Sequence, residues 1–112
     1  MGMRVTRFDV WLVNLGPAVG SEIQETRPCV IVSPDEIHRH LGTAIVAPLT
    51  TAGKPYPSRV ACMFQGGEGK VVLDQLRTVD QVHMVRQVGV LDRATAQRCP
   101  RHVAGTVRLL RP

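Results

Sequence analysis

The sequence predicts a mainly β domain in which short strands form a small barrel and a helix follows at the C-terminus. Short β-favouring segments recur before residue 77, with Gly and Pro between them, and this alternation is typical of small barrels. From Asp92 onward the apolar residues recur at helical spacing instead. A chain of 112 residues suits one domain, since most domains have roughly 100 to 200 residues. We therefore expect residues 1–112 to form a single unit.

The first three predicted strands are the most apolar. Residues 8–15 alternate large apolar residues with others and stop at a Gly-Pro pair, which predicts a half-buried strand with Trp11 in the core. Residues 28–34 and 43–49 are continuous β-favouring runs, as expected for strands buried on both faces. Pro48 lies inside the second of these runs and indicates a bulge or a sheet edge.

The strands predicted next are shorter. Residues 59–64 and 70–76 favour strands, and the glycine-rich residues 65–69 separate them as a turn. Residues 74–80 alternate polar and apolar side chains, which suits one more strand with a polar outer face.

The predicted helical region starts after Asp92, a suitable N-cap for the helix-favouring residues 93–98. Pro100 interrupts it, because proline lacks the N–H that would bond back four residues. We expect a short turn before Pro100 and a second helix that starts there.

Composition narrows the class of protein. The chain is 44% hydrophobic and 21% charged, which excludes disorder as the default state. No apolar run reaches the roughly 18 to 20 residues that cross a bilayer, so we expect a soluble, cytoplasmic protein that does not engage membranes. The cysteines show neither a disulfide framework nor zinc-binding spacing, and we expect them to remain thiols: Cys29, Cys62 and Cys99.

The net charge of +5 is unevenly distributed. Residues 1–76 carry 7 basic and 7 acidic side chains, whereas residues 77–112 carry 7 arginines against Asp80 and Asp92. Arginine suits forked hydrogen bonding to phosphate or carboxylate, although a high-GC genome would produce the same bias.

The histidines favour no metal site. His38 and His40 would point apart on a helix and share a face only on a strand, and two ligands without a third make a weak site. A solvated loop rim is the favoured interpretation of this pair. His83 and His102 are isolated, as surface or boundary residues would be.

The segment from Gly16 to Pro28 is the most informative for chemistry. Because Pro28 holds the preceding residue in extended geometry, Arg27 has a defined place at the entrance of a buried strand. A guanidinium fixed in this way can stabilise charge on a phosphate. A surface salt bridge to Glu22 or Glu25 would also account for Arg27. Thr50-Thr51 could donate to a phosphate at a strand end, although threonine is common there for its β-propensity alone.

Four motifs together resemble a known family. They are Asp9-Val10-Trp11; Gly20-Ser21-Glu22 with Arg27-Pro28; Ala44-Ile45-Val46-Ala47-Pro48-Leu49-Thr50; and Asp74-Gln75-Leu76-Arg77-Thr78-Val79-Asp80. In order and spacing they are similar to the MazF/PemK family of toxin endoribonucleases, over Arg7 to about Leu91. Some relatives have His in place of Ser21, Arg in place of Val72, and Gln in place of Ile23.

The resemblance implies a fold, an activity and partners. The fold would be an SH3-like barrel with a C-terminal helix, active as a homodimer. The activity would be cleavage of single-stranded mRNA at a specific sequence without metal or other cofactor, neutralised by an acidic antitoxin. The matching catalytic positions are Arg27, Thr50, Glu22 and Asp74. The residues expected to bind RNA are Ser21, Thr51, Tyr56, Gln75 and Arg77, with Tyr56 as the stacking candidate.

Metal-free RNA cleavage needs a base for the 2′-hydroxyl, a cation at the phosphate and an acid for the leaving oxygen. We expect Glu22 to be the base and Arg27 with Thr50 to stabilise the phosphate, with Arg27 or a water as the acid. The products would be a cyclic phosphate and a 5′-hydroxyl. A gyrase-poison toxin and a non-catalytic binding module of the same fold are the alternatives. Toxins of the first kind end in a Trp-containing C-terminus, whereas this chain ends Leu109-Leu110-Arg111-Pro112.

Overall fold

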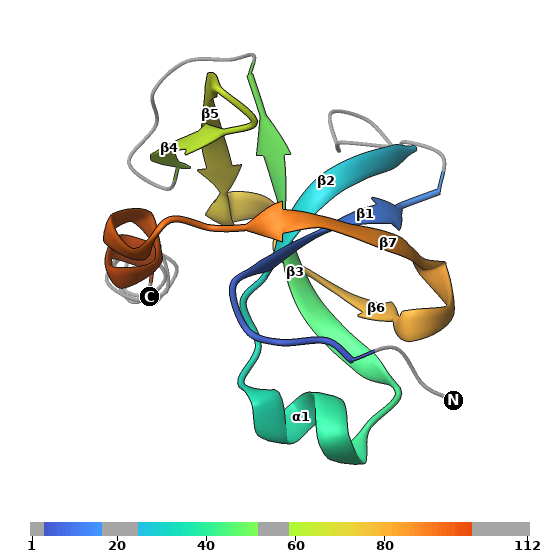
Figure 1. Ribbon diagram of the computed structural model, residues 1–112. Helices are drawn as coiled ribbons and strands as arrows, with labels where there is room; N and C mark the ends of the chain where they lie inside the picture. The colour runs from blue at the N-terminus through green and yellow to red at the C-terminus, as the bar shows by residue number, and fades with distance from the viewer. Residues whose placement is uncertain (1–3, 17–24, 52–58, 100–112) are drawn as a thin grey trace, which may run out of the picture.

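The chain folds as a curled sheet with short helices at its ends (Figure 1). The computed structural model describes residues 4–16, 25–51 and 59–99. A helical segment covers residues 93–99, and none of the described helices is long and apolar enough to cross a membrane. The other elements are, in order, β1 (Asp9–Asn14), β2 (Thr26–Ile31), α1 (Asp35–His40), β3 (Thr43–Thr50), β4 (Arg59–Phe64), β5 (Gly67–Val72), η1 (Leu73–Gln75), β6 (Arg77–Asp80), η2 (Gln81–His83) and β7 (Met84–Val90).

The sheet curls because of how its last two strands pair. The strand order is β4-β5-β3-β2-β1-β7, and β6 pairs with β3 off this path. Strands β6 and β7 therefore flank opposite sides of the β3-β2-β1 unit, yet only Gln81–His83 connects them. In a flat sheet β6 and β7 would be four strand spacings apart, about 19 Å. A three-residue turn does not reach that far. The sheet consequently forms a half-barrel, and the predicted mainly β fold with a C-terminal helix is confirmed.

Strand β3 lies at the centre of this arrangement. It pairs with β2 through Ile31, Val30 and Cys29, and along its other edge first with β6 and then with β5. The change from β6 to β5 occurs between Val46 and Leu49, where Pro48 stands fully buried. Of the two predicted alternatives, a bulge or a sheet edge, Pro48 matches a local edge on one side of β3, since this is the point where β3 changes partner. A residue without an N–H fits there because the ladder on that side is interrupted.

Two predicted boundaries need correction. The turn expected over residues 65–69 contains only Gln65 and Gly66, both with positive φ (51° and 77°), and β5 already starts at Gly67. Two left-handed residues match the twist of a tight hairpin. The strand expected over residues 70–76 ends at Val72, and the one expected over residues 74–80 begins at Arg77, because the short helix η1 comes between them.

Apolar residues cover both faces of the sheet, as the continuous β-favouring runs predict. Neighbouring residues of β1 and β2 enter different cores, so Val30 packs in one cluster while Cys29 and Ile31 pack in the other. The first cluster includes Cys62 of β4 and Ala96 and Cys99 of the helical segment. The second includes Trp11, which is 6% exposed, so its predicted core position is confirmed. All three cysteines are buried free thiols, as expected.

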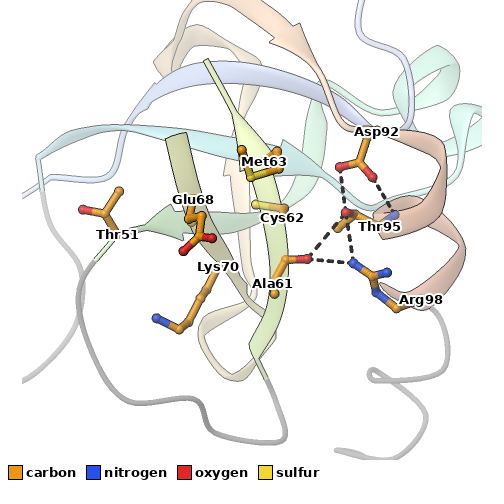
Figure 2. A pocket seen from close by; sticks show the side chains of 10 residues that line it. Thr51, Ala61, Cys62, Met63, Glu68, Lys70, Asp92, Thr95 and Arg98 are labelled. Carbon is orange, nitrogen blue, oxygen red and sulfur yellow. Dashed lines mark hydrogen bonds between the residues drawn. The ribbon is translucent and has the colours of Figure 1, made fainter. Parts of the chain in front are cut away.

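Asp92 caps the helical segment and helps to join it to β4 (Figure 2). Its carboxylate accepts from the Thr95 backbone N–H at 3.0 Å and from the Thr95 hydroxyl at 2.7 Å. Arg98 donates to the Ala61 carbonyl at 2.8 Å. The predicted cap is therefore confirmed, and residues 93–99 are helical up to Pro100. The second helix expected from Pro100 lies outside the described residues.

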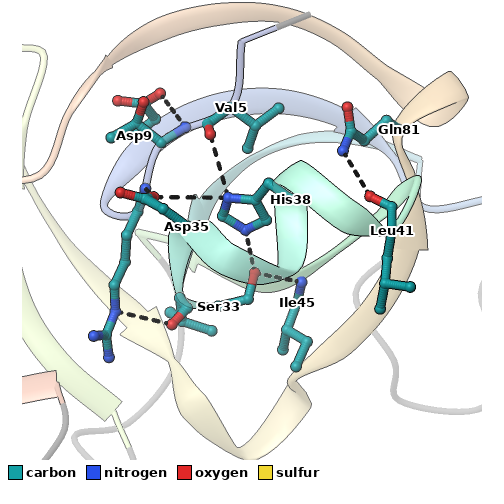
Figure 3. A network of polar contacts seen from close by, with 11 residues as sticks. Val5, Asp9, Ser33, Asp35, His38, Leu41, Ile45 and Gln81 are labelled. Carbon is teal, nitrogen blue, oxygen red and sulfur yellow. Dashed lines mark hydrogen bonds and ion pairs between the residues drawn. The ribbon is translucent and has the colours of Figure 1, made fainter. Parts of the chain in front are cut away.

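The histidine pair belongs to a helix that the sequence analysis did not predict. α1 carries both His38 and His40, and His38 is no part of a solvated rim, because its side chain is only 4% exposed. Its ring nitrogens contact Ser33 Oγ at 2.5 Å and the Val5 carbonyl at 3.2 Å (Figure 3). Ser33 Oγ also accepts from the Ile45 N–H at 3.0 Å. These bonds attach α1 to β3 and to the N-terminal segment. His83, by contrast, is exposed as expected.

Replacing Ser33 by Ala should lower the free energy of unfolding by about 1–3 kcal/mol, because the Ile45 N–H and Nε2 of His38 would lose their hydrogen bonds to Ser33 Oγ. Urea unfolding monitored by circular dichroism measures the change. Thr6→Ala, at an exposed position, is the matched hydroxyl deletion and should change little. Equal effects of the two substitutions would contradict the buried network.

Stability should also depend on pH through Asp92. The hydrogen bond from the Thr95 side chain lowers the pKa of this carboxyl from its ordinary value of 3.8. A lowered pKa in the folded state stabilises the protein above 3.8, and this contribution is lost as the pH falls through the folded-state value. Asp92→Asn keeps a capping side chain but removes the charge.

We therefore expect wild type to exceed Asp92→Asn in stability at neutral pH, and the difference to shrink as the pH is lowered stepwise below 3.8. Urea midpoints across the pH series measure it. Glu36→Gln, at an exposed carboxylate on α1, is the control. A difference that stays constant with pH would show that the charge of Asp92 contributes nothing.

Candidate functional site

Arg27 and Thr50 come together at the ends of two neighbouring strands. The β2–β3 ladder ends with Cys29 of β2 opposite Pro48 of β3, and Arg27 and Thr50 each lie two residues beyond that pair on their own strands. Thr50 in turn pairs with Lys70 of β5. Three polar residues thus lie near one another in the strand pairing, with Lys70 opposite Thr50 and with Arg27 on the strand that pairs with the other edge of β3.

A hollow of about 160 Å³ is lined by both Arg27 and Thr50. Its polar lining comprises Arg27, Thr50, Thr51 and Glu68, while Pro28, Leu49, Cys62 and Phe64 supply apolar walls. Arg27 and Thr51 are exposed and Thr50 is half-buried, so solvent and ligands can reach the site. A guanidinium and two hydroxyls in one small hollow suit a phosphate group.

Gly69 allows β5 to approach Thr50 closely. A Cβ atom at residue 69 would lie 3.3 Å from the Thr50 carbonyl oxygen and 3.8 Å from Cys62 Sγ. The contact with the Thr50 oxygen is tighter than most Cβ contacts, so a larger residue would push against the Thr50 backbone. The close packing of β5 therefore helps to set the position of the Thr50 hydroxyl.

Asp74, Gln75 and Arg77 line a different hollow, of about 310 Å³, at η1 and the start of β6. Asp74 Oδ1 lies 3.4 Å from Arg59 Nε, in an ion pair between η1 and β4. The structure thus brings the predicted residues Arg27, Thr50 and Thr51 into one hollow and Asp74, Gln75 and Arg77 into another.

Cys29 is a buried thiol next to Arg27 in β2. Burial raises the pKa of its thiol to about 12, and the nearby positive charge of Arg77 acts in the opposite direction. The same sulfur lies 3.5 Å from the carbonyl oxygen of Arg27. Cys29 is therefore a neutral core residue with no nucleophilic role at ordinary pH.

A larger hollow of about 410 Å³ adjoins the first (Figure 2). The two share Thr51, Cys62, Glu68 and Gly69. Sequence analysis missed Glu68 and Lys70 because it assigned Glu68 to a turn and Lys70 to an ordinary strand. The available signal was the alternation Glu68-Gly69-Lys70, which places both charges on one face of β5.

Three predicted positions, Ser21, Glu22 and Tyr56, lie outside the described residues. Within residues 4–16, 25–51 and 59–99, no three or more His, Cys, Asp or Glu side chains gather as a metal ion would require.

Comparison with known proteins identifies the family. The profile of the PemK-like, MazF-like toxins of type II toxin–antitoxin systems matches residues 6–106. Endoribonuclease EndoA of Bacillus subtilis is 33% identical over 96 residues, which cover 80% of this chain and 83% of that protein. Endoribonuclease PemK of Escherichia coli is 35% identical over 79 residues, which cover 66% of this chain and 59% of that protein.

Solved structures agree with the fold. MazF from Deinococcus radiodurans superposes with a TM-score of 0.82 at 20% identity, covering 95% of this chain and 98% of that one. A mycobacterial endoribonuclease in complex with its cognate antitoxin superposes with a TM-score of 0.79 at 24% identity, covering 96% and 99%. Together with the matched profile, the shared half-barrel shows that this chain belongs to the PemK-like, MazF-like toxin family of type II toxin–antitoxin systems.

Proposed function

We propose that this protein is an endoribonuclease toxin that cleaves single-stranded mRNA at a specific sequence without a metal ion. The observation that carries the proposal is the hollow in which Arg27 and Thr50 face a common space, in a chain of the PemK-like, MazF-like family. The relatives named endoribonucleases support the same reaction.

In this mechanism the 2′-oxygen of the RNA attacks the adjacent phosphorus. Glu22 accepts the 2′-hydroxyl proton, a new P–O2′ bond forms, and the P–O5′ bond breaks. Arg27 stabilises the negative charge that develops on the phosphate oxygens, and the Thr50 hydroxyl donates a hydrogen bond to one of them. Water protonates the leaving 5′-oxygen, since an arginine with a pKa above about 12 is a poor acid. The products are a cyclic phosphate and a 5′-hydroxyl.

The remaining predicted residues bind and orient the RNA in this scheme. Thr51 borders the cleavage hollow, and Gln75 and Arg77 hold a neighbouring part of the strand in the hollow at η1. Asp74 forms an ion pair with Arg59 beside that second hollow, and from this position it contributes to catalysis. Ser21 and Tyr56 complete the set, with the Tyr56 ring stacking on a base.

The proposal extends to partners and location. The protein acts in the cytoplasm as a homodimer, and an acidic antitoxin neutralises it. The mycobacterial relative solved with its cognate antitoxin supports such a partner. The last third of this chain carries the whole net charge of +5, so an acidic partner is attracted there more than to the neutral first two thirds.

Arg27→Ala should lower kcat for cleavage of a purified single-stranded RNA by roughly 100- to 1,000-fold, because a charge-stabilising group of this kind typically contributes that much. Thr50→Val and Asp74→Asn belong in the same assay and should lose less. Arg39→Ala, on exposed α1 at the far end of the fold, removes a matched guanidinium and should cut like wild type (Figure 1).

The same assay tests the metal-free mechanism and the alternatives. Cutting should survive EDTA and should leave cyclic-phosphate ends. Wild-type rates for Arg27→Ala would remove the central residue of the scheme, and loss of cutting in EDTA would contradict the mechanism. Inhibition of gyrase supercoiling with intact RNA would assign the protein to the gyrase-poison class instead.

Replacing two arginines of the last third by glutamate should weaken antitoxin binding without affecting catalysis. The double variant Arg101→Glu/Arg108→Glu should bind the cognate antitoxin at least about tenfold more weakly at low salt, because like charges now repel, while RNA cleavage stays close to wild type. Titration calorimetry at low and high salt measures the affinity, with Arg39→Glu as control. Strongly reduced cleavage with unchanged antitoxin binding would reverse this division of roles.

A further inference from the structure

The β4–β5 hairpin supplies one side of the hollow that contains Arg27 and Thr50. The hairpin residues that line it are Cys62, Phe64, Gly67, Glu68 and Gly69. The ladder that joins this hairpin to β3 consists of the two pairs Leu49–Val71 and Thr50–Lys70. Because so short a ladder ends well before the tip of the hairpin, other contacts determine where the outer end near Phe64 lies.

Phe64 makes such a contact, since its ring lies against β7 at Gly89. A Cβ atom at residue 89 would lie 3.1 Å from Phe64 Cε1, 3.9 Å from Cζ and 4.0 Å from Cδ1. The first of these distances is tighter than most Cβ contacts, so a side chain at residue 89 would displace the ring. The ring therefore keeps its position because residue 89 has no Cβ.

The backbone conformation does not require a glycine at residue 89. Gly16 and Gly66 have positive φ, whereas Gly89 does not. Gly89 lies inside β7 and pairs with Val10 of β1. A glycine inside a strand weakens the strand and often marks the close approach of another group. The ring of Phe64 is the group that approaches here.

The surroundings of the ring determine which way it would move. Phe64 is half-buried and packs against the first apolar cluster, which contains Val10 and Leu49. Such interiors are close-packed and have little room for a displaced ring. The hollow, by contrast, is open space that the ring borders. A ring pushed away from Gly89 consequently moves into the hollow and narrows it.

We propose that Gly89 and Phe64 are a positioning pair for RNA cleavage. The ring rests on the glycine backbone and thereby sets the width of the hollow around the scissile phosphate. Gly89 acts through Phe64, and Phe64 acts through the shape of the hollow. This inference rests on the proposed nuclease function, and it adds steric control of the phosphate to the charge stabilisation by Arg27.

The test uses RNA with a larger atom at the scissile phosphate. The cut linkage is first mapped on unmodified single-stranded RNA. A short oligonucleotide then carries one phosphorothioate at that linkage, so that sulfur replaces one non-bridging oxygen, and the two diastereomers are assayed separately. The ratio of kcat/KM for oxygen to kcat/KM for sulfur reports the space at the phosphate. Because both rates come from one preparation, the ratio does not depend on the fraction of protein that is folded.

Gly89→Ala should lower kcat/KM for unmodified RNA by roughly tenfold, because a small misplacement of groups around a reacting centre is costly. Its oxygen-to-sulfur ratio should rise by about threefold or more for at least one diastereomer, since a narrower hollow disfavours the larger atom. Phe64→Leu removes the edge of the ring and widens the hollow, so it should lower the same ratio.

The double variant Gly89→Ala/Phe64→Leu tests the contact itself. Leucine has no atom equivalent to Cε1, so Gly89→Ala should cost less than about twofold in that background. Gly42→Ala is the matched control, because a Cβ atom at residue 42 would meet nothing within 4 Å and its φ is not positive. This control should leave both the rates and the ratio unchanged.

Unchanged oxygen-to-sulfur ratios in Gly89→Ala and Phe64→Leu would overturn the inference and leave the nuclease proposal intact. A loss of rate in Gly89→Ala that persists in the double variant would overturn it as well, because the ring would then not be the cause. If Gly89→Ala does not fold, an unchanged ratio in Phe64→Leu is sufficient to refute the inference. A wild-type protein that does not cut RNA would refute both proposals.

Discussion

The pairing of β3 with three other strands is the constraint on which the rest of the structure depends. One edge pairs with β2 at Val46–Pro48, while the other pairs with β6 before Pro48 and with β5 after it. That exchange lets the sheet divide, so β6 returns toward β7 and the β4–β5 hairpin projects on the other side. Both hollows that contain Thr51 lie where the hairpin leaves the half-barrel. Their existence follows from a strand that changes partner at a residue without an N–H.

The structure has two parts that differ in burial: a packed interior, called the frame here, and a group of accessible polar residues at strand ends, called the strip. The frame consists of two apolar clusters on opposite faces of the sheet and of the buried bonds of Ser33 and His38. The strip consists of exposed or half-buried polar residues at strand ends, of which Arg27 and Thr50 are the clearest examples. Strand ends allow such groups to face solvent while packed backbone fixes their position. The strip needs no strong net charge, since residues 1–76 are neutral overall.

Local sequence rules predicted most strands correctly and failed at particular points for physical reasons. The strand predicted over residues 59–64 coincides with β4, because the alternation of apolar and polar side chains and the flanking turns are properties of the local sequence. The helix α1 was missed because its stability comes from contacts of His38 and Asp35 with the N-terminal segment, far away in sequence. Glu68 was missed because glycines on both sides indicated a turn, whereas pairing with β4 extends the strand to Gly67.

The sequence by itself determined the family, the mainly β class, the apolar strands and the candidate residues Arg27, Thr50 and Asp74. These depend on residue type and spacing along the chain. Only the tertiary structure decided which candidates share a space: Arg27 and Thr50 line one hollow, Asp74 lines a separate one, and Glu68 joins the first. The reason is that long-range pairing brings together residues 23 and more positions apart, such as 27 and 50, and no local pattern encodes that pairing.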